Sequence, residues 1–258
     1  MSGMQWGLAG LRGFAMASIL AGSADAQMLE VKERPPQYSY ASFWQIPRAR
    51  WPEMASVDAA DKVILDKALA NGIIVGYGNE TNFIHEPDGS THADWWSSMS
   101  MAGLVTVLNQ LNGSGPFPVL ESATKHWDEI LVARYYNSRP GSWQGIYTYA
   151  GWYKLKPGAP DDAVETLSKQ LLAPLLEKLL GDGALLQYEI DTEVAHTHAP
   201  PGSFWILSLA ANAEAIDKIN AAVQDAEKTN PLGWVAFDSM VDSSQSREYM
   251  TLATATYK

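Results

Sequence analysis

The stretches YSYASFWQI (residues 38–46) and YTYAGWYKL (residues 147–155) decide the fold. They share two tyrosines and an alanine at matching positions, and most other positions exchange one residue for a similar one. Both stretches are rich in the aromatic residues that favour β-strands. A near repeat of this kind, 109 positions further along the chain, predicts that the protein consists of two related halves.

The segments that follow the two strands also match. Residues 52–71 and 161–180 carry apolar side chains at helical spacing and each is followed by glycine, although Pro174 is expected to kink the second helix. GIIVGYGNETNFIHE (residues 72–86) then aligns with GALLQYEIDTEVAHT (residues 183–197) as a second strand. Each half continues with a polar turn, a third strand, a second helix, an irregular connection and a last strand. Asn212 is expected to cap the second helix of the second half.

The order of elements is therefore β-α-β-β-α-β, twice. This order predicts an α+β protein made of two tandem ferredoxin-like repeats, packed sheet to sheet as a pseudo-dimeric α/β barrel. We place the boundaries at 1–26 for a signal peptide, 27–36 for a linker, 37–140 for the first repeat and 141–258 for the second. Alternation along the first strand sets Tyr38, Tyr40 and Trp44 on one face, and Ser39, Ala41 and Phe43 on the other.

Composition and the N-terminus limit the partners and the compartment. A net charge of −11 and a pI near 4.8 leave no basic surface for nucleic acid, and the absence of cysteine excludes disulfides and thiolate metal sites. Arg12, a short apolar run and the sequence Ala24-Asp25-Ala26 are typical of a secretory signal cleaved after Ala26. We expect a periplasmic or secreted chain without a membrane span, the alternative being a frayed cytoplasmic N-terminus.

On this repetition and order of elements, residues 38–258 resemble the dimeric α/β-barrel superfamily, which includes antibiotic-biosynthesis monooxygenase-like, EthD-like and stress-responsive barrel proteins. In that group two ferredoxin-like sheets pack face to face, between two chains or within one duplicated chain. The resemblance implies that no second chain is needed to complete the barrel. It also implies that haem can bind without a readable motif, so the cofactor is left open. No signature motif of one family is present, and no family residue is carried over.

Histidines are the first candidates for chemistry, because the chain has only five. His85 and His196 occupy equivalent places at the ends of the second strands and are the candidate acid/base residues. His198 could form a His-x-His metal pair with His196, but the neighbouring carboxylates of Asp191 and Glu193 should face the other side of that strand. We assign no metal site.

Aromatic residues are the stronger feature, with ten tryptophans in the chain. They predict a cavity for a flat or apolar small molecule, unless they simply pack the core. The candidate ligand-binding residues are Tyr77, Tyr188, Trp44 and Tyr153. Acidic residues of the helices are interpreted as solvent-facing: Asp58, Asp61, Asp66, Glu165 and Glu177.

Two functional hypotheses follow. The first is an exported enzyme that resembles the cofactor-independent monooxygenase or EthD-like barrels and acts on an aromatic or apolar substrate. The second is a non-catalytic binding or interaction protein with a packed interior. Signature loops of nicotinamide, flavin and phosphate-loop proteins are absent from the sequence.

Overall fold

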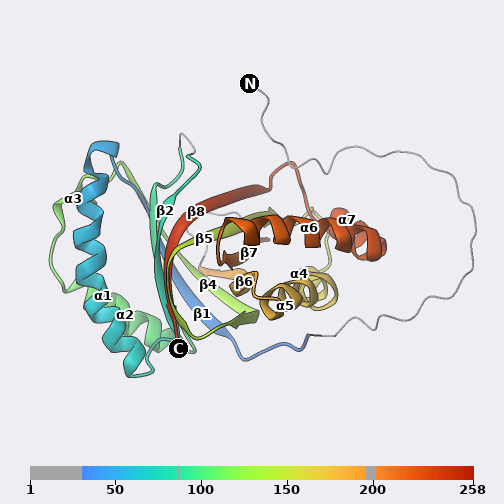
Figure 1. Cartoon of the computed structure of the whole chain (residues 1–258), viewed down its shortest axis with the longest axis horizontal. Coiled ribbons are helices and arrows are strands. Elements are labelled where there is room, and N and C mark those ends of the chain that lie inside the picture. The colour runs from blue at the N-terminus through green and yellow to red at the C-terminus, as the bar shows by residue number, and fades with distance from the viewer. Residues whose placement is uncertain (1–30, 86–87, 196–201) are drawn as a thin grey trace, which may run out of the picture.

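A computed structural model describes residues 31–85, 88–195 and 202–258; the predicted leader, His196 and His198 lie outside them. Eight strands close into one antiparallel barrel, with helices on two opposite sides (Figure 1). The α+β class and the barrel expected from the sequence are confirmed. Within the described residues, no helix has both the length and the apolar character needed to cross a membrane.

The elements follow one another along the chain in the expected order. The first half comprises β1 (Gln37–Gln45), the 3₁₀ turn η1 (Arg48–Glu53), α1 (Met54–Ala70), β2 (Gly76–Asn82), β3 (His92–Ser98), α2 (Met101–Asn112), α3 (Pro118–Glu121) and β4 (Lys125–Ser138). The second half comprises β5 (Gly141–Lys154), α4 (Ala163–Leu167), the π-helical turn η2 (Ser168–Leu172), α5 (Ala173–Gly181), β6 (Leu185–Ala195), β7 (Ser203–Ala210), α6 (Ala213–Thr229), α7 (Pro231–Met240) and β8 (Arg247–Tyr257).

Strand order around the barrel is β1-β3-β2-β8-β5-β7-β6-β4. Each half contributes four neighbouring strands, in the order β4-β1-β3-β2 and β8-β5-β7-β6. The halves are joined by two further antiparallel pairs, β2 with β8 and β4 with β6. Closure leaves no unpaired sheet edge in the barrel.

Side-chain caps fix the starts of the second helices. Ser100 accepts a hydrogen bond from the backbone N–H of Gly103 at 3.1 Å, which begins α2. Asn212 accepts from the backbone N–H of Ala215 at 2.9 Å and begins α6, which confirms the cap predicted for it. Each cap satisfies a backbone donor that the first helical turn leaves free.

Two segments differ in detail from the sequence prediction. The chain before Pro174 forms the π-helical turn η2, which accommodates a residue that cannot donate a backbone hydrogen bond, and the kink expected there stays a prediction. The connections expected to be irregular contain helices α3 and α7. Both begin with proline at the first helical turn, where the missing N–H costs nothing.

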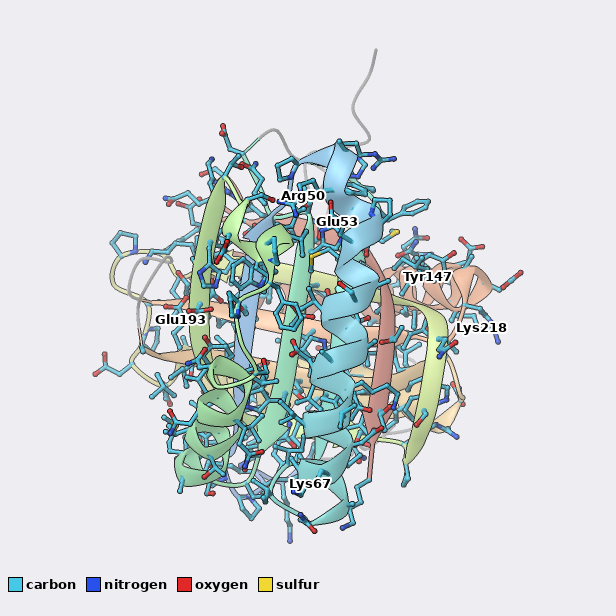
Figure 2. The ribbon with its side chains drawn as sticks, turned by 90° about the vertical axis from the view of Figure 1, so that its left-hand side faces the viewer. Arg50, Glu53, Lys67, Tyr147, Glu193 and Lys218 are labelled. Carbon is cyan, nitrogen blue, oxygen red and sulfur yellow. The ribbon has the colours of Figure 1, made fainter. Side chains whose placement is uncertain are left out.

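The two helical layers pack differently against the barrel. Leucines of α4, η2 and α5 form the larger core cluster with Tyr188, Phe204 and Phe237. In the first half, a smaller cluster joins Leu65 of α1 and Leu104 of α2 to the sheet. Figure 2 looks onto this first layer and shows α1 running roughly along the nearest strands, with Arg50 and Glu53 near one end and Lys67 near the other.

The predicted alternation along β1 holds, and it decides which side chains face which layer. Tyr38 and Tyr40 pack with the helices of the first half. Ser39, Ala41 and Phe43 face the barrel interior, where they line a cavity. The aromatic face therefore lies under the helices, and the face with smaller side chains lies inside the barrel.

A candidate ligand groove between the barrel and the first helical layer

A groove of about 1030 Å³ lies between the outer face of β1–β4 and helices α1 to α3. Its floor is built from three rows of side chains that cross neighbouring strands in register. The first row is aromatic: Tyr40 on β1 is paired with Trp96 on β3, which is paired with Tyr77 on β2. The Tyr40 and Trp96 rings stack with centroids 4.4 Å apart.

The second row is polar. Ser42 on β1 is the partner of both Asp128 on β4 and Asp94 on β3, and Asp94 is in turn the partner of Asn79 on β2. Four consecutive strands thus present a polar side chain to the groove at the same height. Directly paired strand residues have Cβ atoms about 5 Å apart, so these groups can contact one ligand together.

The third row runs through Trp44, and one of its two histidines, His126, lines the groove. His126 on β4 and His92 on β3 are both register partners of Trp44 on β1. The His126 ring stacks on Trp44 at 3.6 Å, and its Nε2 lies 3.0 Å from both Ser42 Oγ and Asp128 Oδ1. His92 is buried, and this burial lowers its pKa to about 4, so it is neutral at physiological pH.

Helix α1 adds two carboxylates above the polar row. Asp58 and Asp61, three residues apart on the helix, both line the groove. Burial raises the pKa of Asp58 to about 6, and burial together with the charge of Asp58 does the same for Asp61. Burial, with the charges of Asp58, Asp61 and Glu80, holds the pKa of Asp94 well above its usual range. Near neutral pH, Asp58 and Asp61 are mostly ionised, whereas burial favours the protonated form of Asp94.

This placement corrects the interpretation of the acidic helix residues. Asp58 and Asp61 turn toward the sheet instead of facing solvent. Asp66 on α1 accepts a short hydrogen bond from the Tyr77 hydroxyl, and Lys62 Nζ donates to the same hydroxyl at 3.1 Å. The sequence predicts a solvent position for a carboxylate on a helix from its residue type alone. The direction of its side chain depends on which face of the helix packs against the sheet.

In the second half, the equivalent tyrosine makes an equivalent contact. The Tyr188 hydroxyl donates to Glu177 Oε1 at 2.7 Å, and Glu177 also accepts from Asn137 Nδ2 at 3.0 Å. Both tyrosine–carboxylate pairs are separated by eleven positions in the sequence. Glu177 is thus another helix carboxylate directed at the sheet.

Predicted ligand-binding residues are distributed over both layers. Tyr77 and Trp44 line the groove. Tyr188 and Tyr153 belong to the packed core of the second half, where Tyr153 stacks on Phe204 at 5.4 Å. The structure therefore brings two of the four to the groove and packs the other two, the buried Tyr188 and the half-buried Tyr153, into the core of the second half.

His85, one of the two predicted acid/base histidines, does not line the groove. His85 is exposed just beyond β2, and its ring meets the edge of Trp51 at 5.3 Å. Its partner His196 lies outside the described residues, so the acid/base role of both stays a prediction. His126, which does line the groove, was not singled out from the sequence. Its alternation with Asp128 at the start of a strand is the signal that could have found it.

Metal binding has no support within the part of the chain that the structure describes. No three His, Asp or Glu side chains there are grouped so that they could hold a metal ion. The groove is instead an aromatic floor interrupted by carboxyl, hydroxyl, amide and imidazole groups. Such a surface suits a flat organic molecule that also carries hydrogen-bonding groups.

The chain has the fold of the monooxygenase-like α+β barrels. A structure named a putative monooxygenase from Lactobacillus acidophilus NCFM matches with a TM-score of 0.59 and 13% identity, over 87% of this chain and 97% of that one. One of the same name from Fusobacterium nucleatum subsp. nucleatum matches with a TM-score of 0.63 and 8% identity, over 87% and 95%. An anthrone oxidase-like protein matches with a TM-score of 0.56 and 11% identity, over 87% and 94%. No family model and no curated protein matches the sequence.

Proposed function

We propose that the chain binds a flat aromatic molecule in the groove and oxidises it with dioxygen, as a cofactor-independent monooxygenase-like enzyme. The polar row formed by Ser42, Asp94 and Asn79 carries the proposal. At the matching places on β5, β7 and β6, the second half has Gly151, Ile206 and Ile190, and it keeps a carboxylate, Glu248 on β8, at the place of Asp128. The fold therefore tolerates an apolar row at this height, and the polar row needs another reason.

The size and shape of the groove support an aromatic substrate of several rings. Its volume of about 1030 Å³ is at the upper end of the range of ligand pockets. Four aromatic residues of its floor line the groove: Trp44, Tyr40, Trp96 and Tyr77. The names of the structural neighbours, two monooxygenases and an anthrone oxidase-like protein, motivate the choice of an oxidative reaction.

In the proposed reaction, Asp61 and Asp58 act as the base and Asp94 acts as the acid. The ionised Asp61, assisted by Asp58, removes a proton from an acidic CH₂ group flanked by aromatic rings, and the electron pair remains on the substrate as a delocalised carbanion. The carbanion reacts with dioxygen, forming a C–O bond, and Asp94 supplies the proton that yields a hydroperoxide. A pKa close to the working pH allows such groups to give and take protons.

The remaining steps restore the starting protonation. The second C–H proton passes to Asp94 as the O–O bond breaks, which leaves a ketone and a hydroxide. Asp61 returns its proton to the hydroxide as water. The sum is one CH₂ group and one dioxygen giving one C=O group and one water, with both oxygen atoms accounted for.

We further propose that the barrel arose by tandem duplication of a ferredoxin-like unit and that the chain is exported. Support for duplication comes from the strand order repeated in each half and from the two tyrosine–carboxylate pairs at the same spacing. Overlay of the halves tests it through Tyr38 on Tyr147. N-terminal sequencing of the native protein tests export, for which a mature chain starting at Gln27 is expected and one starting at Met1 would count against it.

The test of the proposed activity uses anthrone as probe and measures dioxygen consumption. The protein should accelerate conversion to anthraquinone above the rate in buffer, with one dioxygen consumed per anthrone. Asp58→Asn with Asp61→Asn should reduce kcat by about 100-fold or more, the usual contribution of a positioned base. Asp225→Asn, which removes an exposed charge on α6, is the matched control and should leave the rate unchanged.

Two results would separate the alternatives. Binding of anthrone that Trp44→Ala weakens, without any dioxygen uptake, would assign the chain to the non-catalytic binding class. The proposal would be refuted if a panel of anthrones and hydroxylated polycyclic aromatics showed no binding and no turnover. An equal loss of rate in Asp225→Asn would show that the effect is one of overall charge.

A further inference from the structure

A second chamber lies inside the barrel, on the opposite side of the sheet from the groove. Its volume is about 270 Å³. Four tryptophans from different strands line it: Trp95, Trp127, Trp152 and Trp205. Alternation along each strand directs these side chains inward, in the same way that it directs Tyr40 and Trp96 outward.

Carboxyl groups converge on the same chamber. Glu80, Glu129 and Glu189 all line it. Glu80 accepts from Thr148 at 2.7 Å, Thr251 at 2.8 Å and the Trp95 indole at 3.2 Å. The described residues of the lining include a single basic side chain, Arg247, which is exposed and so marks the mouth.

The two other carboxylates are more completely enclosed. Glu129 is 2% exposed, and Glu189 is 3% exposed and accepts from Gln37 at 2.7 Å and Ser39 at 3.2 Å. No arginine or lysine forms an ion pair with either within the described part of the chain. Burial, with the charge of Glu193, raises the pKa of Glu129 to about 7, and burial raises that of Glu189 to about 7.

Next to the chamber, but outside its lining, Asp191 is a further carboxylate that the protein leaves unsatisfied. It lies two positions after Glu189 on β6, on the inward face, with Trp205 as its register partner on β7. Its side chain is fully buried, and neither carboxylate oxygen has a hydrogen-bond partner among the described residues. A buried carboxylate without a partner is strongly disfavoured, so this site calls for a cation or a retained proton.

We propose that the barrel interior binds a small organic cation of the quaternary or tertiary ammonium class. Tryptophan faces attract such a cation through their quadrupoles, and an aromatic cage is the usual way in which proteins recognise methylated ammonium groups. Glu129 and Glu189 supply the balancing negative charge. The binding site is separate from the groove, and the proposal does not depend on the oxidation proposed there.

The size and ligand types of the chamber favour this class over others. A volume of about 270 Å³ fits a compact ammonium but is small for a polycyclic molecule. An anion would meet three carboxylates and no inward-facing base among the described residues. A bare metal ion would need grouped ligands, which the described residues do not provide.

The experiment compares the binding of choline with that of 3,3-dimethylbutan-1-ol, which has the same shape without the charge. Both are measured by isothermal titration calorimetry at about pH 8, because carboxyl groups with a pKa near 7 are ionised there. Choline should bind, and the neutral alcohol should bind at least tenfold more weakly, because cation–π attraction in a desolvated site is lost with the charge. Glu129→Gln should weaken choline at least tenfold. Asp225→Asn and the groove variant Asp61→Asn should leave its affinity unchanged.

Three outcomes would overturn the proposal: equal affinity for choline and the alcohol, unchanged affinity for choline in folded Glu129→Gln, or no binding of choline or tetramethylammonium at millimolar concentration. Weakening by Asp61→Asn instead of Glu129→Gln would place the cation in the groove and equally refute an interior site. Far-ultraviolet circular dichroism of each variant shows that the fold is intact.

Discussion

Replacement of Glu129 by glutamine should stabilise the protein at alkaline pH and change little at acidic pH. Glu129 is enclosed in the barrel, 2% exposed, and its pKa is raised from 4.5 to about 7 by burial and the charge of Glu193. The nearby Trp205 indole opposes the shift but does not cancel it. The folded protein therefore keeps a proton that the unfolded chain releases between pH 4.5 and about 7.

The sign and size of the effect follow from proton linkage. Because the folded state binds more protons in this window, the free energy of unfolding falls as pH rises through it and then levels off. Each pH unit contributes about 1.4 kcal/mol, so ionised Glu129 costs about 3 kcal/mol above pH 7. Glutamine keeps the shape and the neutral charge, and it should restore about this amount at pH 8.

Urea denaturation followed by tryptophan fluorescence measures the difference, at about pH 5 and about pH 8. We expect Glu129→Gln to shift the midpoint upward at the higher pH and to leave it within about 1 kcal/mol of the parent at the lower pH. Asp225→Asn should shift neither. A variant that is equally destabilised at both pH values would show that the carboxylate makes contacts worth more than its burial costs, and the reasoning would fail.

Three further predictions concern other parts of the molecule. Tyr188→Phe removes a part-buried 2.7 Å hydrogen bond to Glu177 and should lower the free energy of unfolding by about 2 kcal/mol. Tyr77→Phe should cost less, because its partner Asp66 is 51% exposed, and equal losses in urea denaturation would contradict this. If Asp58 and Asp61 are the base, anthrone oxidation should rise with pH through about 6, and a flat profile would exclude them. Gly78→Ala should destabilise the barrel by about 2 kcal/mol, because the new Cβ would overlap the Thr254 carbonyl and the Trp95 ring. Gly181→Ala is the control, because the space around Gly181 is open. A similar thermal midpoint for both variants would argue against the clash.

The order of strands and helices was predictable because each element carries a periodic apolar pattern and a local start or stop signal. Asn212 is the best example: its side chain type and the apolar residues after it are enough to locate the start of α6. The π-helical turn before Pro174 was not predictable in this way. The sequence shows that the helix must adjust at proline, but the packing of Leu171 and Leu172 into the core selects the form of the adjustment.

The candidate site was only partly predictable, for a different reason. Tyr77 and Trp44 stand out as aromatic residues on strands, and both line the groove. Asp94 and Asn79 come from separate strands and become neighbours only through register, which no local pattern reveals. Asp58 was misinterpreted because a carboxylate on a helix is usually solvated, and only the orientation of α1 shows that it faces the sheet.

The two halves of the barrel differ in how the helices cover the sheet. The second half covers Ile190 and Ile206 with leucines of α5 and its neighbours, and it gains the packing that a closed apolar layer provides. The first half places Asp94 and Asn79 at the matching positions and leaves a groove under α1. This arrangement lacks the apolar packing of the second half, and it raises the pKa of Asp58, Asp61 and Asp94. Since the same architecture accepts either arrangement, the cost of the polar row supports the ligand that we propose for the groove. The packed half then serves as the rigid support that keeps the strands of the groove in register.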